Sequence, residues 1–147
     1  MTIRYKRDLD GVNWDTMRAV LIADNFDNGR SPAQYARSFA NSAVTCIAYD
    51  GDQIVGTARA LSDGVCNAYV VDVWTLSAYR RRGIAARMMA ELSDDLPGQH
   101  VFLFTDEALN FYMNLGFRRQ GIGLSKVIGR WLDNQPLASQ NDDSQED

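Results

Sequence analysis

The stretch Tyr69-Val-Val-Asp-Val-Trp-Thr-Leu-Ser-Ala-Tyr-Arg-Arg-Arg-Gly-Ile-Ala85 decides the fold class, because it joins a strand to a helix through a basic turn. Its β-branched and aromatic residues predict a strand over 68–76. Three arginines and Gly83 follow, and the helical pattern continues to Leu92. The first N–H groups of a helix lack intrahelical partners and carry partial positive charge, so this turn predicts a pyrophosphate site.

The residues of the turn support this interpretation without proving it. Arg80, Arg81 and Arg82 add full positive charge, and Gly83 has no Cβ to keep the backbone from a phosphate. A solvated run of surface arginines is the competing interpretation. The turn is neither a P-loop, since no Gly-Lys-Ser/Thr follows, nor a dinucleotide fingerprint, since two of the three glycines are missing.

The remaining patterns predict one α/β (α+β) domain with a mixed sheet. Asn13 and the pair Ser31-Pro32 have the residue types that begin helices. Helices are expected over 14–23, 32–39, 84–92 and 107–115, and strands over 3–7, 44–49, 53–61, 68–76, 100–104 and 124–128. The order βααβββαβαβ describes an antiparallel meander followed by a βαβ unit. The crossover through its helix makes the strand over 100–104 parallel to the strand over 68–76.

Length and charge set limits on the domain and its partners. The chain has 147 residues, with fifteen bases and fourteen acids before residue 133, so residues 1–132 carry +1 and residues 133–147 carry −5. We expect a single domain over 1–132 and an acidic, disordered tail over 133–147. A nearly neutral body favours a small anionic ligand and argues against nucleic acid as a partner.

Other compartments and chemistries are disfavoured by composition. The chain has no run of about 18 apolar residues and no apolar region in Met1–Arg7, so we expect no membrane partner and a cytoplasmic location. Two cysteines and one histidine cannot build a zinc cage, so we expect no metal. Cys46 lies in an apolar strand pattern, which is typical of an inert buried thiol.

Two motifs occur in a specific order. Arg80-Arg-Arg-Gly83-Ile-Ala85 follows the strand pattern Asp-Val-Trp-Thr, and Ala108-Leu-Asn-Phe-Tyr-Met-Asn-Leu-Gly-Phe117 comes later. The pair resembles the GNAT superfamily of acetyl-CoA-dependent N-acetyltransferases, which carry Gln/Arg-x-x-Gly-x-Gly/Ala and Ala-x-x-Leu/Phe-Tyr-x-x-x-Gly-Phe. The likeness covers about residues 3–128. Within the superfamily, Leu61-Ser-Asp-Gly64 and Phe111–Phe117 most resemble the plastid and cyanobacterial branch that includes serotonin N-acetyltransferases.

The resemblance implies a GNAT-like sheet and an enzyme that transfers an acetyl group from acetyl-CoA to a primary amine by direct attack. It implies that the strand parts from its parallel neighbour near its end, where backbone groups pair with pantetheine. The cofactor-binding residues implied are Val73, Trp74, Thr75, Arg80, Arg81, Arg82, Gly83, Ile84, Ala85 and Ala86.

Tyr112 and Asp72 are the candidate catalytic residues. A phenol has a pKa of about 10, so Tyr112 can supply a proton to the departing thiolate, although a tyrosine beside Phe111 can also be packing alone. Asp72 is the carboxylate that an apolar strand explains least, which makes it the first candidate base. Asp106 and Glu107 are alternatives, with structural roles at a helix start, and His100 is a more remote one.

Two departures from the family pattern bear on the site. Many members carry Asn seven residues before the helix tyrosine, where this chain has Thr105. Many also carry Glu on the preceding strand, whereas His100–Phe104 has no carboxylate. The cofactor contact at the first position and the base at the second are therefore in doubt.

The acceptor is expected against the loop of residues 24–30. Phe26 offers a ring to an aryl amine, and Asp24 or Asp27 offers charge to its ammonium group. A small aryl or alkyl amine is the preferred acceptor. A protein lysine or N-terminal acetyltransferase and an acyl-CoA-binding module without turnover remain alternatives, and a homodimer is left open.

Overall fold

The computed structural model describes residues 2–132, which form a five-stranded mixed sheet in the order β1-β2-β3-β4-β5. The first four strands pair antiparallel with their neighbours, and the fifth runs parallel to the fourth. The strands are β1 (Ile3–Lys6), β2 (Val44–Asp50), β3 (Gln53–Ser62), β4 (Asn67–Thr75) and β5 (His100–Phe102). The expected GNAT-like mixed sheet is confirmed.

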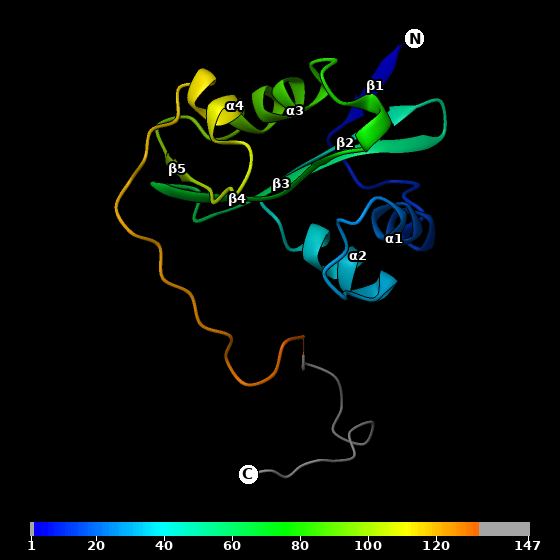
Figure 1. The fold of residues 1–147 in the computed structure, drawn as a ribbon, viewed down its shortest axis with the longest axis horizontal. Helices are drawn as coiled ribbons and strands as arrows, with labels where there is room; N and C mark the ends of the chain where they lie inside the picture. Colours follow the sequence, from blue (N-terminus) through cyan, green and yellow to red (C-terminus); the bar gives the residue numbers. More distant parts are fainter. Residues whose placement is uncertain (1, 133–147) are drawn as a thin grey trace.

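Four helices cover the two faces of the sheet, two on each (Figure 1). One face carries α1 (Trp14–Ala23) and α2 (Pro32–Ala40), and the other carries α3 (Ile84–Ser93) and α4 (Leu109–Asn114). A short 3₁₀ turn, η1 (Ser77–Tyr79), connects β4 to the basic turn before α3.

Local chemistry places the starts of α1 and α2 where the sequence predicts them. The Asn13 side chain accepts a hydrogen bond from the backbone N–H of Thr16 at 3.0 Å. Ser31 and Gln34 form a reciprocal capping box, and Pro32 takes the first helical position. These caps satisfy N–H groups that would otherwise have no partner at the helix ends.

The sheet separates two hydrophobic cores. Met88 and Leu92 of α3 pack on Val55 on one face, and Phe39 of α2 packs with Trp74 in the other core. The α3 core comes closest to the sheet at Gly56, where a Cβ would lie only 3.0 Å from the Met88 side chain. Glycine at this position therefore sets how near α3 sits to the strands.

Two predicted boundaries differ from the structure by two residues, and one predicted strand is absent from the described residues. The strand expected over 100–104 ends at Phe102, and the helix expected from Glu107 begins at Leu109. The strand expected over 124–128 is wrong, because this segment pairs with no strand among residues 2–132 and its apolar side chains are exposed. The predicted acidic tail, 133–147, lies outside the described residues.

Two further observations concern the chain as a whole. None of the helices within residues 2–132 is long and apolar enough to cross a bilayer. Cys46 is fully buried, and burial raises the pKa of its thiol to about 11, so it stays protonated and inert as predicted.

Candidate functional site

A cavity of about 730 Å³ opens where β4 and β5 part. Their parallel pairing covers only three positions and ends at Tyr69 and Phe102, although β4 continues to Thr75. One wall of the cavity is therefore the second half of β4, and the facing wall is the chain from Leu103 to Ala108. The parting that the sequence resemblance implied is present.

The basic turn and the start of α3 form one end of this cavity. Gly83 caps the helix in the left-handed conformation, with φ +81°, and a Cβ there would meet no other atom within 4 Å. Nine of the ten expected cofactor residues line the cavity: Val73, Trp74, Thr75, Arg80, Arg81, Gly83, Ile84, Ala85 and Ala86. Arg82 does not, and its guanidinium lies 5.0 Å from the centre of the Tyr79 ring.

Thr75 supplies a polar atom that the described residues leave without a partner. Its Oγ1 is buried and has no hydrogen bond, while its backbone carbonyl accepts one from Arg80 Nε at 3.2 Å. A buried hydroxyl without a partner is costly, so this atom suits a ligand that can bond to it inside the cavity.

Tyr112 lies in the same cavity and is only 8% exposed. Its ring makes edge contacts with Phe111 and Phe117, with centroids 4.9 and 5.8 Å away. The hydroxyl has no hydrogen-bond partner among residues 2–132. Burial raises the pKa of the phenol, so Tyr112 keeps its proton at neutral pH and can donate it to a leaving group.

Asp72 lies in a β-bulge at the cavity wall. In the pairing of β3 with β4, Thr57 faces Trp74 and Arg59 faces Val71, so β4 has one extra residue in between. Asp72 adopts φ +56°, a conformation that L-residues rarely hold. The Thr57 hydroxyl donates to its carbonyl oxygen at 2.9 Å and fixes the bulge.

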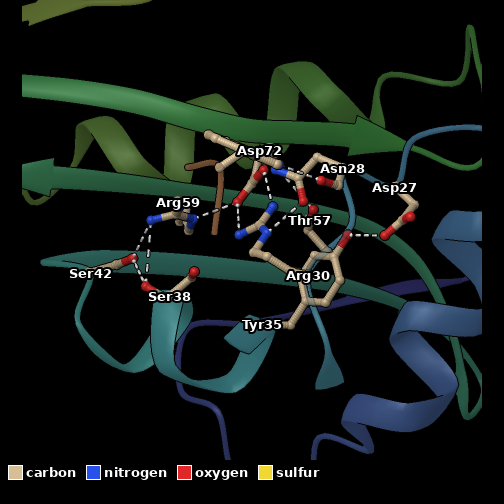
Figure 2. Close-up of polar contacts among 10 residues, drawn as sticks. Asp27, Asn28, Arg30, Tyr35, Ser38, Ser42, Thr57, Arg59 and Asp72 are labelled. Carbon is tan, nitrogen blue, oxygen red and sulfur yellow. Dashed lines mark hydrogen bonds and ion pairs between the residues drawn. The ribbon is translucent and has the colours of Figure 1, made fainter. Parts of the chain in front are cut away.

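Two largely buried arginines form ion pairs with the carboxylate of Asp72 (Figure 2). The Arg30 guanidinium donates hydrogen bonds to both carboxylate oxygens, at 2.8 and 3.0 Å, and Arg59 Nε donates to one of them at 2.6 Å. Burial by itself would raise the pKa of this carboxyl, but the two guanidinium groups outweigh it and hold the pKa below its ordinary value. A carboxylate held in this way is a poor proton acceptor, which favours a positioning role for Asp72 over the predicted role of base.

The alternative acids differ in their access to the cavity. Asp106 and Glu107 both line it, facing the end of β4. Neither caps α4, whose N-cap residue is Ala108 and has no side-chain cap. The Ala108 N–H instead donates to the Thr105 hydroxyl at 3.0 Å. His100 does not line the cavity, and its ring lies 4.1 Å from the ring of Phe102.

Only Phe26 of the three expected acceptor residues lines the cavity. The Asp24 carboxylate accepts hydrogen bonds from Trp74 Nε1 at 2.9 Å and from the Ser77 N–H at 3.1 Å. Asp27 accepts one from the Tyr35 hydroxyl at 3.0 Å. The two carboxylates thus hold the loop in place, which does not favour them as partners of a substrate ammonium.

Within residues 2–132, no three histidine, cysteine, aspartate or glutamate side chains gather as metal ligands would. The polar groups that line the cavity include the phenol of Tyr112, the hydroxyl of Thr75, the carboxylates of Asp106 and Glu107, and the start of α3.

Comparison with known proteins identifies the family. A family model described as an acetyltransferase (GNAT) domain matches residues 41–123. The chain belongs to the GNAT acetyltransferase family. The match includes the basic turn, the start of α3 and Tyr112, so every residue that lines the cavity except Phe26 lies in the matched segment.

Relatives agree with this assignment at low identity. The chloroplastic GCN5-related N-acetyltransferase 1 of Arabidopsis thaliana is 27% identical over 129 residues, which are 84% of this chain and 65% of the relative. The chain thus spans less than two thirds of that protein. A GNAT-family acetyltransferase from Streptococcus pneumoniae superposes with a TM-score of 0.73 at 25% identity, over 88% of this chain and all of the other. A putative acetyltransferase from Deinococcus radiodurans gives 0.75 at 24% identity, over 84% and 87%.

We predict that Asp72→Asn destabilises the fold by about 3 kcal/mol, because it leaves two buried guanidinium groups without their counter-charge. Urea unfolding followed by fluorescence measures this change. Asp8→Asn is the matched control, since Asp8 has a side chain 61% exposed and should cost little. If Asp72→Asn retains full stability but loses turnover, the carboxylate is a catalytic base and the positioning role is wrong.

We predict that the difference in unfolding free energy between the wild type and Asp72→Asn depends on pH. The folded-state pKa of Asp72 is lowered, so its stabilising contribution is complete above the ordinary carboxyl pKa of about 3.9. That contribution is lost as the pH falls from there through the folded-state value. The stability difference between wild type and Asp72→Asn should therefore be constant near neutrality and shrink in acid.

Proposed function

We propose that this chain is an acetyl-CoA-dependent N-acetyltransferase that acts on a small aryl or alkyl amine. The observation that carries the proposal is a single cavity that connects the start of α3 with the buried phenol of Tyr112, across the parting of β4 and β5. A phosphate site, an exposed strand edge and a proton donor lie along one path.

The end of the cavity at α3 fits the pyrophosphate of the acetyl donor. The N–H groups from Gly83 to Ala86 begin the helix, and its dipole favours negative charge there. Arg80 and Arg81 add positive charge on the cavity wall. Further along the cavity, the Thr75 hydroxyl has no hydrogen-bond partner among the described residues and is available to the pantetheine arm. The backbone of β4 beyond its pairing with β5 can also hydrogen-bond to this arm, as it would to an added strand.

The acyl transfer then needs one proton removed and one supplied. The amine lone pair forms the new C–N bond to the acetyl carbon, the C–S bond breaks, and the thiolate takes a proton from the Tyr112 hydroxyl. The positively charged nitrogen loses a proton as the amide forms, and this proton restores the Tyr112 hydroxyl directly or through water. The ammonium form of the acceptor must first lose a proton. Asp106 and Glu107 line the same cavity and are the carboxylates in place to accept it, directly or through water.

The preferred acceptor class follows from the shape and charge of the acceptor side. Phe26 lines the cavity and offers an apolar ring, and residues 1–132 carry a net charge of only +1, which favours a small amine over a highly charged protein substrate. The plastid serotonin N-acetyltransferase-like motifs point toward the same class of aryl amine. A protein lysine acetyltransferase and an acyl-CoA-binding module remain as outcomes of the test.

A screen of acceptors with detection of the released thiol tests the proposal directly. We expect turnover with tryptamine-like or phenethylamine-like amines, and Phe26→Ala should raise KM for them with less effect on kcat, as loss of uniform binding does. Exposed Ile22→Ala on α1 is the control. Turnover of lysine peptides alone would favour the protein acetyltransferase, and donor binding without any thiol release would favour the binding module.

We predict that Gly83→Asp abolishes binding of acetyl-CoA, because it puts bulk and negative charge where the phosphates are expected. Isothermal calorimetry measures the affinity. Gly98→Asp is the matched control, since Gly98 has φ +77°, similar open space and no place in the cavity wall. Unchanged affinity in folded Gly83→Asp would remove the phosphate site from the start of α3.

We predict that Tyr112→Phe lowers kcat by about 10²-fold, the usual size of a lost general acid, while donor affinity and stability stay near wild type. The ring keeps its contacts with Phe111 and Phe117, so only the proton is removed. Rates at saturating substrate, compared with Tyr69→Phe at another lining tyrosine, measure the effect. An unaltered kcat would make Tyr112 a packing residue.

A further inference from the structure

The basic turn before α3 is held in a conformation that one of its arginines does not favour. Arg81 adopts φ +65° and Gly83 adopts φ +81°, and only glycine takes this left-handed region without a steric penalty. An arginine in that region costs free energy and persists only where surrounding contacts hold it. Strained residues of this kind are concentrated at ligand sites, so the contacts that fix this turn bear on binding.

The 3₁₀ turn η1 leads into the basic turn and receives little support from the core. None of its three residues is fully buried, and Tyr79 packs only partly on the core of α3. The start of η1 is anchored by the Ser77 N–H, which donates to the carboxylate of Asp24 at 3.1 Å. The end of η1, next to the arginines, has its own anchor in the side chain of Tyr79.

Tyr79 connects the basic turn with the hairpin of β2 and β3. Its hydroxyl donates to the carboxylate of Asp50 at 2.5 Å, across 29 residues of chain. Its ring lines the cavity and lies 5.0 Å, at its centre, from the Arg82 guanidinium. The hydrogen bond to Asp50 raises the pKa of the phenol, so the hydroxyl remains a donor at neutral pH. One side chain thus contacts the hairpin, the cavity and the turn.

Asp50 lies on the sheet side of this contact. It is the last residue of β2, where it pairs with Gln53 of β3 and with Ile3 of β1. It does not line the cavity, so it can act on a ligand there only through Tyr79. A hydrogen bond to a carboxylate is shorter and stronger than one to a neutral oxygen. The hairpin therefore presents a fixed, charged acceptor to the end of η1.

We propose that Asp50 is a positioning residue for the donor site: through Tyr79 it holds the turn of residues 80–83 in the shape that receives the diphosphate of the acetyl donor. The inference rests on the proposed donor site at the start of α3 and adds to it a residue outside the cavity. A turn already held in its binding shape does not have to be ordered when the ligand arrives. Loss of the anchor should therefore weaken donor binding and leave the chemical step unchanged.

Calorimetric titration with CoA measures this effect without any turnover. We expect Asp50→Ala and Tyr79→Phe each to weaken CoA binding about tenfold, because both remove the same hydrogen bond and phenylalanine keeps the ring. The double variant should bind no more weakly than either single variant. Asp50→Asn should retain most of the affinity, since its amide oxygen can still accept the phenolic hydrogen.

Asp52→Ala is the matched control. Asp52 is exposed in the turn of the same hairpin and does not line the cavity, so its loss removes the same charge without touching Tyr79. Its affinity for CoA should stay at the wild-type value. Far-UV circular dichroism and urea unfolding verify that every variant remains folded.

A truncated donor separates the positioning role from a general disturbance of the site. Acetyl-pantetheine lacks the diphosphate, so Asp50→Ala and Tyr79→Phe should leave its kcat/KM unchanged. With acetyl-CoA, the same variants should raise KM and keep the wild-type kcat, as expected when only binding is lost.

Unchanged CoA affinity in folded Asp50→Ala or Tyr79→Phe overturns the inference. Additive losses in the double variant overturn it as well, because they show that the two residues act separately. An equal loss with acetyl-pantetheine does the same, by placing the effect away from the diphosphate. A wild type that binds no CoA rejects the proposed function together with this inference, whereas wild-type binding that the variants retain rejects only the role of Asp50.

Discussion

The ion pairs between Asp72 and two guanidinium groups hold the β4 bulge in place, and this bulge forms part of the cavity wall. Strand β4 must leave its regular pairing to form the wall, and it does so through a bulge whose left-handed residue costs on the order of 1–3 kcal/mol. Arg30 ties that residue to the loop before α2, and Arg59 ties it to β3. The ion pairs therefore connect the loop before α2, the sheet and the cavity wall (Figure 2).

Sequence reasoning succeeds wherever the deciding interaction is local. The cap of Asn13, the capping box of Ser31 and the glycine at the start of α3 each act within four residues, and the structure has all three helices where these residues predict them. The β-hairpin and the parallel crossover follow from alternation and chain direction. For the same reason the sequence indicates the turn at residues 80–86 as a ligand site, and all of these residues except Arg82 line the cavity.

The sequence could not reveal contacts between residues far apart in the chain. The sequence does not show the two arginines that bind Asp72, because they are 42 and 13 residues away and an arginine in a turn or strand carries no pattern that identifies its partner. Asp24 was similar, since its hydrogen bond to Trp74 spans 50 residues. The strand expected over 124–128 has the right alternation, but alternation describes only one face and not the neighbour that a strand needs.

Tyr112 shows why packing and chemistry are not competing explanations for a buried polar side chain. Its ring is held between Phe111 and Phe117, and that same burial raises the pKa of the hydroxyl. The Tyr112 hydroxyl is not among the fully buried atoms without a hydrogen bond in residues 2–132, which are Arg7 Nε and Thr75 Oγ1, so it is reached from the cavity and does not carry the cost of an unpaired buried group. This hydroxyl borders the cavity with no partner among the described residues, so the packing that holds the ring also keeps a proton at a fixed place beside the cavity.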